Sequence, residues 1–375
     1  MKQSAVFAGM ALLAMTSFSQ AQHQDKDSGE LIQIAILLDA SNSMDGLIGQ
    51  AKTQLWKIVN ELALAKRNGR VPRLEVAFYE YGKSSLPSST GYIRQIVPLS
   101  TDLDKISDEL FKLTTNGGDE YCGQVLQRAI EDLAWNPNAG VMKAIFIAGN
   151  EAFTQGSFDY AKSCREAIAK GIVVNTIFCG SKSEGINTKW KDGADLADGS
   201  FMNIDQNRKV VDVKAPQDSM IMALGQQLNA TYISYGSAGT ARKEMQLKQD
   251  ENALASAPAA MVQRSVAKAS AGYSNEYWDL VDAKKGKMVS LAEMKAEELP
   301  EEMKKMSPKE REAYVEKKAA ERAELQTKIS TLNTERRKYV AEEQKKLSGD
   351  NTLDKAVIDA VRKVAVKKGY SFESK

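Results

Sequence analysis

The stretch LIQIAILLDASNSMD, from Leu31 to Asp45, decides the fold of this 375-residue chain. Its first eight residues are apolar except for Gln33, a run that is typical of a strand buried on both faces of a parallel sheet. Apolar residues then recur at helical spacing, at Leu47, Ile48, Ala51, Leu55, Ile58, Val59 and Leu62. We therefore predict a strand, a loop and a helix, with the loop at the carboxyl end of the strand, where ligands bind in open α/β sheets.

The predicted loop carries oxygen side chains at every second position, namely Asp39, Ser41 and Ser43. One carboxylate and two hydroxyls are hard-oxygen ligands, which suit Mg²⁺ held together with several waters. The alternative is structural, because Asp and Ser after a strand often only cap the next helix. The pentapeptide alone does not separate these two interpretations.

Strands and helices alternate after this first unit. Strands are predicted at 74–81, 92–99, 141–148, 172–179 and 200–204, and helices at 102–113, 121–133, 158–170, 190–197 and 218–228. Pro98 suits an edge strand, because proline cannot donate a hydrogen bond to a neighbouring strand. The predicted fold class is α/β, with a doubly wound, mostly parallel sheet followed by a mainly α-helical C-terminal region.

Residues 30–235 resemble a von Willebrand factor A (VWA) domain. The matching segments are ILLDASNSM, GGDEYCGQVL, AIFIAGNE, GIVVNTIFCG and LADGSF, in that order along the chain. Asp39-x-Ser41-x-Ser43 looks like the first motif of the family's metal-ion-dependent adhesion site. The resemblance implies a doubly wound fold, a bound Mg²⁺ or Mn²⁺, and a protein partner whose Asp or Glu side chain completes the metal's coordination.

The other two metal motifs of the family are altered in this chain. Where the family has a Thr in a glycine-rich loop, this sequence has Asp119, with Thr114 and Thr115 a few residues upstream. Where the family has an Asp after the fourth strand, this sequence has Gly149 followed by Asn150. Asp119 adds a carboxylate where the family has a hydroxyl, so the site keeps two carboxylates although the third motif has lost its own. The alternative interpretation is a degenerate metal site. The predicted metal ligands are Asp39, Ser41, Ser43, Asp119 and Asn150, with Thr115 and Glu151 as neighbouring surface residues.

Composition argues against several classes of function. The only histidine is His23, so Ser-His-Asp and Cys-His catalysis and histidine-ligated zinc are excluded within one chain. A formal net charge of +2 gives no reason to expect nucleic-acid binding. We predict that the protein is not an enzyme, and the remaining catalytic alternative is a metal-assisted hydrolase that uses Asp39 and Asp119.

The N-terminus resembles a secretory signal peptide over residues 1–21. Lys2 precedes an apolar run up to Met15, and Ser19-Gln20-Ala21 is a small-x-small cleavage site. No later stretch approaches the roughly 18 apolar residues of a transmembrane helix. We therefore predict an exported, soluble protein that is periplasmic or extracellular and does not span a membrane.

Export makes disulfides possible, and the chain has three cysteines, Cys122, Cys164 and Cys179. Right-handed crossovers place the helices that start near Tyr121 and Phe158 on the same face of the sheet. We therefore predict a Cys122–Cys164 disulfide, with Cys179 outside it. The alternative is three reduced and separated cysteines.

The sequence changes character after Ser234. Residues 236–272, which are rich in Ala and Ser from 253 to 271, are predicted to form a linker or a weak helix. Residues 273–375 are predicted to be helical, with one long charged helix from a capping box at Ser307 to about Leu347. Its apolar residues are too few for a good coiled coil. We expect an accessory region, so that a fragment ending near Ser237 folds alone.

The leading functional prediction is thus an exported VWA-type binding module that engages a partner carboxylate through Mg²⁺. A scaffold without a working metal site is the second interpretation. Among other polar residues, Glu80 is interpreted as a local salt-bridge partner. Trp190 and Asp192 either line the binding surface or pack locally.

Overall fold

The computed structural model describes residues 30–44, 56–204, 213–346 and 353–372. Six strands form one sheet in the order β4-β3-β1-β5-β6-β7, and only the edge pair β3–β4 is antiparallel. The strands are β1 (Leu31–Asp39), β3 (Arg73–Tyr81), β4 (Ile93–Ser100), β5 (Met142–Gly149), β6 (Ile172–Cys179) and β7 (Phe201–Ile204). Counted along the chain, this order is 3-2-1-4-5-6, the doubly wound order of α/β sheets. The predicted fold class is confirmed.

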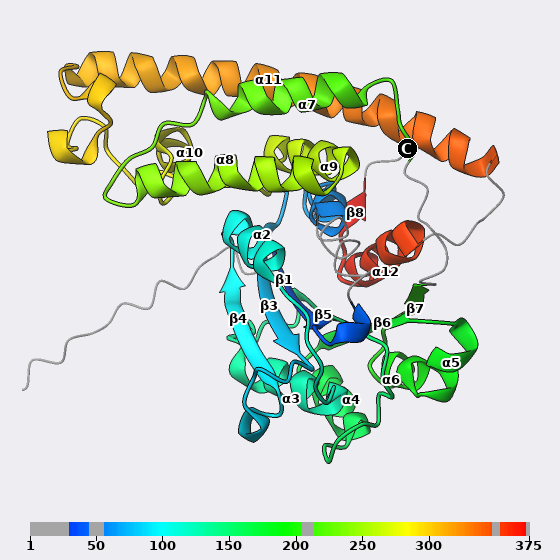
Figure 1. The fold of residues 1–375 in the computed structure, drawn as a ribbon. Helices are drawn as coiled ribbons and strands as arrows, with labels where there is room; N and C mark the ends of the chain where they lie inside the picture. Colours follow the sequence, from blue (N-terminus) through cyan, green and yellow to red (C-terminus); the bar gives the residue numbers. More distant parts are fainter. Residues whose placement is uncertain (1–29, 45–55, 205–212, 347–352, 373–375) are drawn as a thin grey trace, which may run out of the picture.

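One face of the sheet is covered by helices that lie between the strands in sequence. These are α3 (Cys122–Asp132), α4 (Tyr160–Ala169) and α6 (Trp190–Leu196), with the short α5 (Lys182–Asn187) beside them. Alternate strand residues such as Leu37, Ile147 and Val174 pack against the buried sides of these helices. In Figure 1 these helices lie at the bottom of the view, on the far side of the sheet from the long helices. We call this the local face.

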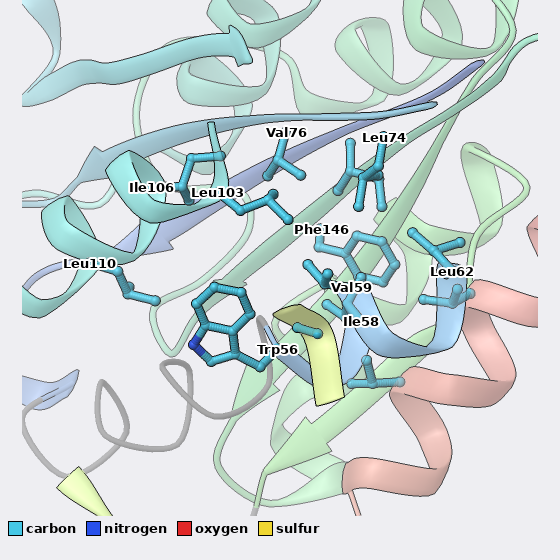
Figure 2. Close-up of a cluster of buried hydrophobic side chains, with 14 of the residues drawn as sticks. Trp56, Ile58, Val59, Leu62, Leu74, Val76, Leu103, Ile106, Leu110 and Phe146 are labelled. Atoms are coloured by element: carbon cyan, nitrogen blue, oxygen red, sulfur yellow. The ribbon is translucent and has the colours of Figure 1, made fainter. Parts of the chain in front are cut away.

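The opposite face is covered by segments from distant parts of the chain. Residues 56–62 are helical, and α2 (Leu103–Lys112) lies beside them. The third cover is α12 (Leu353–Lys367), whose Val361 packs in the same apolar cluster as Phe146 of β5. Figure 2 shows this cluster, with Trp56 lying among side chains from the sheet and α2. We call this the remote face.

A layer of helices lies on top of the remote face. It consists of α7 (Asp218–Asn229), α8 (Gly239–Ser256), α9 (Pro258–Ala269), α10 (Leu280–Lys285) and α11 (Pro308–Lys346). Of the two interpretations of residues 236–272, a linker or a weak helix, the structure supports the helix, because α8 and α9 occupy this segment. Its small residues serve close helix packing instead. A Cβ on Gly225 of α7 would lie 2.3 Å from the Ser265 hydroxyl of α9, so the two helices approach each other closely.

Buried cations tie this layer to the sheet region. The Arg264 side chain is fully buried and forms ion pairs with Asp104 of α2 at 2.8 Å and with Asp250 of α8 at 2.6 Å. Its guanidinium also lies 5.1 Å from the Trp56 ring centroid. A buried charge is tolerated only when it is paired in this way. Inside the helical layer, Arg322 of α11 is paired in the same way, with Asp279 at 2.7 Å and with Asp282 at 2.9 Å.

The C-terminal end of the described chain returns to the first strand. The short strand β8 (Ser371–Phe372) pairs antiparallel with β2 (Ala65–Lys66), and the Tyr370 hydroxyl donates to the Leu31 carbonyl at 3.1 Å. A helical C-terminal region is thus confirmed. Its predicted accessory status stays a prediction, although a chain ending at Ser237 would lose α12, which covers part of the remote face. The predicted signal peptide at 1–21 lies outside the described residues.

Candidate functional site

Asp39 ends β1 and lies at the carboxyl end of the sheet. Its side chain is fully buried. One oxygen, Oδ1, accepts a hydrogen bond from the backbone N–H of Ser41 at 2.7 Å. The other oxygen, Oδ2, is buried and has no hydrogen-bond partner among the described residues. A buried carboxylate oxygen without a partner destabilises a fold, so this atom needs another group.

Two serines and an asparagine continue from Asp39 along the same edge. The hydroxyls of Ser41 and Ser43 form a hydrogen bond at 2.7 Å, and the Ser43 hydroxyl donates to Asn150 Oδ1 at 2.9 Å. Because β1 and β5 are parallel neighbours, the residues that follow them meet. Four of the five predicted ligands therefore lie together. The bond from Ser41 to Asp39 also fits the capping interpretation, so local geometry alone does not exclude it.

The fifth predicted ligand, Asp119, points elsewhere. Its carboxylate is exposed and accepts a hydrogen bond from the Tyr121 hydroxyl at 3.1 Å. The next residue, Glu120, is buried beside Asp39 instead. A Cβ built on Gly82 would lie 2.7 Å from Glu120 Cγ and 2.9 Å from Asp39 Oδ1, so both side chains press against this glycine. The structure thus brings Glu120, rather than Asp119, to the predicted site.

The acidic side chains of this edge affect one another. Burial is the main cause that raises the pKa of Asp39 to about 6. Hydrogen bonds from Ser41 offset part of this rise, and the nearby negative charge of Glu151 adds to it. Burial raises the pKa of Glu120 to about 7, and the charges of Asp39 and Glu151 add to that rise. Like charges in a poorly solvated place disfavour ionisation, and a cation between them favours it. The site therefore has the electrostatic character of a cation site.

The backbone of the loop after β5 is held by a buried tryptophan. The Trp190 indole N–H donates to the Glu151 carbonyl at 2.7 Å, and its ring packs 4.9 Å from Phe153 and 5.7 Å from Phe178 between centroids. Asp192 accepts a hydrogen bond from the Tyr160 hydroxyl at 2.7 Å. Local packing is therefore the correct interpretation of both Trp190 and Asp192.

The remaining polar predictions are local interactions. Glu80 pairs with Arg94 at 2.5 Å and with Lys83 at 3.8 Å, which confirms the predicted salt bridge. Lys83 also donates to the Thr114 hydroxyl at 2.9 Å, so Thr114 has a partner outside the site. Thr115 is half-buried in the same loop.

The cysteines do not form the predicted disulfide. All three are buried and none is bridged. The helices α3 and α4 do lie side by side (Figure 1), but their thiols face different neighbours. Cys122 Sγ lies 3.6 Å from the Tyr81 hydroxyl, whereas Cys164 Sγ donates to the Gly193 carbonyl at 3.3 Å. Burial raises the pKa of Cys164 to about 12, which keeps that thiol protonated and unreactive.

The donor set fits a hard divalent cation held largely by oxygen. Within the described ranges, no three Asp, Glu, His or Cys side chains are placed to hold a metal ion together. A cation at this edge would therefore rely on hydroxyl and amide oxygens beside the carboxylates. Mg²⁺ is bound in this way, through one or two carboxylates and water. The residues present, with the unpartnered Asp39 Oδ2, meet that requirement.

No protein-family model matches this sequence, and no curated protein matches it. Among solved structures, BatB from Bacteroides thetaiotaomicron is 16% identical over 46% of this chain and 90% of its own, with a TM-score of 0.35. The SpRpn10 VWA domain is 15% identical over 48% of this chain and 91% of its own, with a TM-score of 0.37. A von Willebrand factor type A protein from Catenulispora acidiphila is 15% identical over 47% of this chain and 38% of its own, with a TM-score of 0.34.

The class of the α/β region follows from its own topology. A doubly wound sheet with one antiparallel edge strand, and an Asp-x-Ser-x-Ser loop after its central β1, is a VWA-type fold. A long helical extension follows it in the chain.

Proposed function

We propose that the VWA-type region is a protein-interaction module that holds Mg²⁺ or Mn²⁺ at the carboxyl end of its sheet. The observation that carries this proposal is Asp39 Oδ2, a fully buried oxygen without a hydrogen-bond partner among the described residues. The other oxygen of the same carboxylate accepts from the Ser41 backbone N–H, and the side chains of Ser41, Ser43 and Asn150 are joined by hydrogen bonds along the same edge. The bound cation would supply positive charge for a carboxylate of the partner, an Asp or Glu side chain.

A binding role is proposed over a catalytic one because the required reactive groups are missing or occupied. The chain's only histidine is His23, so a general base of that type is not at hand. The hydrolase alternative requires Asp39 and Asp119 to act together, but Asp119 accepts from Tyr121 instead. The cation is therefore proposed to recognise a carboxylate rather than to activate water.

We propose that this binding takes place after export, in the periplasm or outside the cell. The signal-like composition of residues 1–21 supports this location. In the part of the chain that the structure describes, none of the helices combines the length and the apolar character needed to cross a bilayer.

The test is cation-dependent thermal stability. A ligand that binds only the folded state raises the melting temperature, so Mg²⁺ or Mn²⁺ should stabilise the wild type but not Asp39→Asn. Asp132→Asn is the matched control, because Asp132 is at the end of α3 and pairs with Arg128 at 3.0 Å. Its response should equal that of the wild type.

Two outcomes would contradict the proposed function. An equal shift in the wild type and Asp39→Asn would place the cation elsewhere. No shift in either protein would favour the scaffold without a working metal site. Partner capture from an extract, with and without chelator, then tests whether binding depends on the cation.

A further inference from the structure

We propose that Glu120 is the second carboxylate ligand of the cation site, so that the site holds its cation before any partner arrives. This inference rests on the proposed function and specifies it further. The VWA family, as the sequence resemblance implies, uses a threonine hydroxyl in this loop. Glu120 places a charged oxygen donor there and changes what the site can do.

The first support is how Glu120 is positioned. Its side chain is 6% exposed and lies against Gly82 on the side where Asp39 also contacts that residue. Its backbone N–H donates to Gln155 Oε1 at 2.8 Å, which ties the residue to the segment after β5. Glu120 is therefore held at the site by two separate segments of the chain.

The second support is a pair of glycines that make this approach possible. A Cβ on Gly118 would lie 2.6 Å from the Gly82 carbonyl oxygen, a distance that real Cβ atoms do not adopt. Gly82 itself has a φ of +78°, and a Cβ added at this position would collide with Glu120 and Asp39. The two loops can pack closely only with glycine at both positions, because glycine lacks a Cβ and tolerates positive φ. The contact between the two loops brings Glu120 close to Asp39.

The third support is independent of the acidic pair. Asp39 Oδ2 is a buried oxygen without a partner in the described chain, on the residue that Glu120 approaches. A second carboxylate beside it increases repulsion unless a cation lies between the two. Two carboxylates balance the charge of one divalent cation. The site should therefore bind Mg²⁺ or Mn²⁺ without a carboxylate from a partner.

The test measures Mn²⁺ binding to the full chain by calorimetry, with no partner present. Glu120→Gln keeps the size of the side chain and removes its charge. Its Mn²⁺ affinity should fall by about 10-fold or more, since even residues behind a metal ligand are worth 10- to 100-fold. Asp119→Asn is the matched variant, one residue away and exposed, and it should bind as the wild type does.

The outcomes separate this inference from the proposed function. If Asp119→Asn loses affinity and Glu120→Gln does not, the assignment of Glu120 is overturned. If the wild type binds Mn²⁺, Asp39→Asn does not, and Glu120→Gln binds normally, this inference fails and the proposed function stands. If the wild type itself binds no divalent cation, the proposed function fails. Circular dichroism checks that each variant is folded. Glu120→Ala repeats the test with a side chain that lacks the amide oxygen of glutamine.

A pair of glycine variants tests the positioning. Gly82→Ala introduces a Cβ between Glu120 and Asp39 and should weaken Mn²⁺ binding although no ligand is changed. Gly69→Ala is matched in backbone strain, with a φ of +76° against +78°, but its Cβ would meet nothing within 4 Å. It should bind Mn²⁺ normally. Equal affinity in both variants would show that the contact at Gly82 does not position Glu120, which overturns this part of the inference.

Discussion

The two faces of the sheet are built in opposite ways. The local face is covered by α3, α4 and α6, which lie between 122 and 196 in sequence and connect the strands they cover. The remote face is covered by residues 56–62, by α2 and by α12, which begins more than 140 residues after β7 ends. The local face can form from the VWA-type segment alone. The remote face requires the C-terminal end of the chain.

This difference separates function from stability. Asp39 ends β1, Glu120 lies in the loop that leads into α3, and Asn150 follows β5. The candidate site therefore depends on the VWA-type segment. The helical extension is far from a passive tail, since its α12 and α9 share one apolar cluster with the sheet. We infer that the extension stabilises the fold, while the edge of the sheet carries the proposed cation site.

The largest expected effect is that of truncation after Ser237. Such a chain lacks α8 to α12, so the apolar remote face loses α12, while residues 56–62 and α2 remain on it. It should be insoluble or unfold without cooperativity, because the burial of apolar surface drives folding. Urea unfolding followed by circular dichroism measures this. A soluble fragment with a sharp transition would mean that the remote face does not need the extension.

The next largest effect is expected for Arg264→Ala. The substitution leaves Asp104 buried without its cation and removes one of the two cations that pair with Asp250, which should cost about 3–5 kcal/mol of the free energy of unfolding. Arg242→Ala is the matched control, because Arg242 pairs with Asp102, the N-cap residue of α2, but is partly exposed. It should cost at most about 1 kcal/mol. Equal losses in chemical denaturation would contradict a special role for the buried network.

Valine substitutions then compare the two faces directly. Val361 of α12 and Val125 of α3 are both fully buried, one on each face. Each Val→Ala change should cost about 1–3 kcal/mol, because burial rather than sequence distance sets the loss. Val366 of α12 is 59% exposed, and Val366→Ala should cost about 0.5 kcal/mol or less. If Val361→Ala behaves like Val366→Ala in denaturation, α12 is not part of the core.

The sheet could be predicted from the sequence because its signals are local. A continuous apolar run such as Leu31 to Leu38 indicates a buried strand without knowledge of its neighbours. The cover of the remote face could not be predicted. The apolar stripe of α12 indicates a buried side but not which surface it packs on, and small residues at 253–271 are shared by linkers and by closely packed helices such as α9.

The candidate site follows the same division. The common position of Asp39, Ser41, Ser43 and Asn150 could be predicted because these residues end or follow two parallel strands, and parallel strands end at one edge. The position of Glu120 could not be predicted, because the 114–121 loop has no periodicity. Aligning this loop with the family's motif can therefore be wrong by one residue. The signal for it was the glycine pair, since Gly82 and Gly118 allow a close contact, but only the structure reveals that they contact each other.

The smallest expected effect is a pH dependence that arises inside the helical layer. Lys268 of α9 is fully buried; its ammonium pairs with Asp250 at 2.6 Å and donates to Asn229 at 2.5 Å and to the Gly225 carbonyl at 3.3 Å. Burial lowers its pKa to about 8, and the charge of Arg264 lowers it further against the attraction of Asp250. Burial therefore favours the neutral amine in the folded chain.

The sign of the effect follows from proton counts. Between pH 8 and about 10, the unfolded chain keeps the Lys268 proton and the folded chain loses it, so this residue makes the free energy of unfolding rise with pH. Below pH 8 both states are protonated and the contribution is flat. Lys268→Met should remove the rise, whereas Lys248→Met, at an exposed position on α8, should keep it. Urea unfolding at pH 7, 8, 9 and 10 measures both variants, and an unchanged slope in Lys268→Met would mean that Lys268 stays charged in the folded protein.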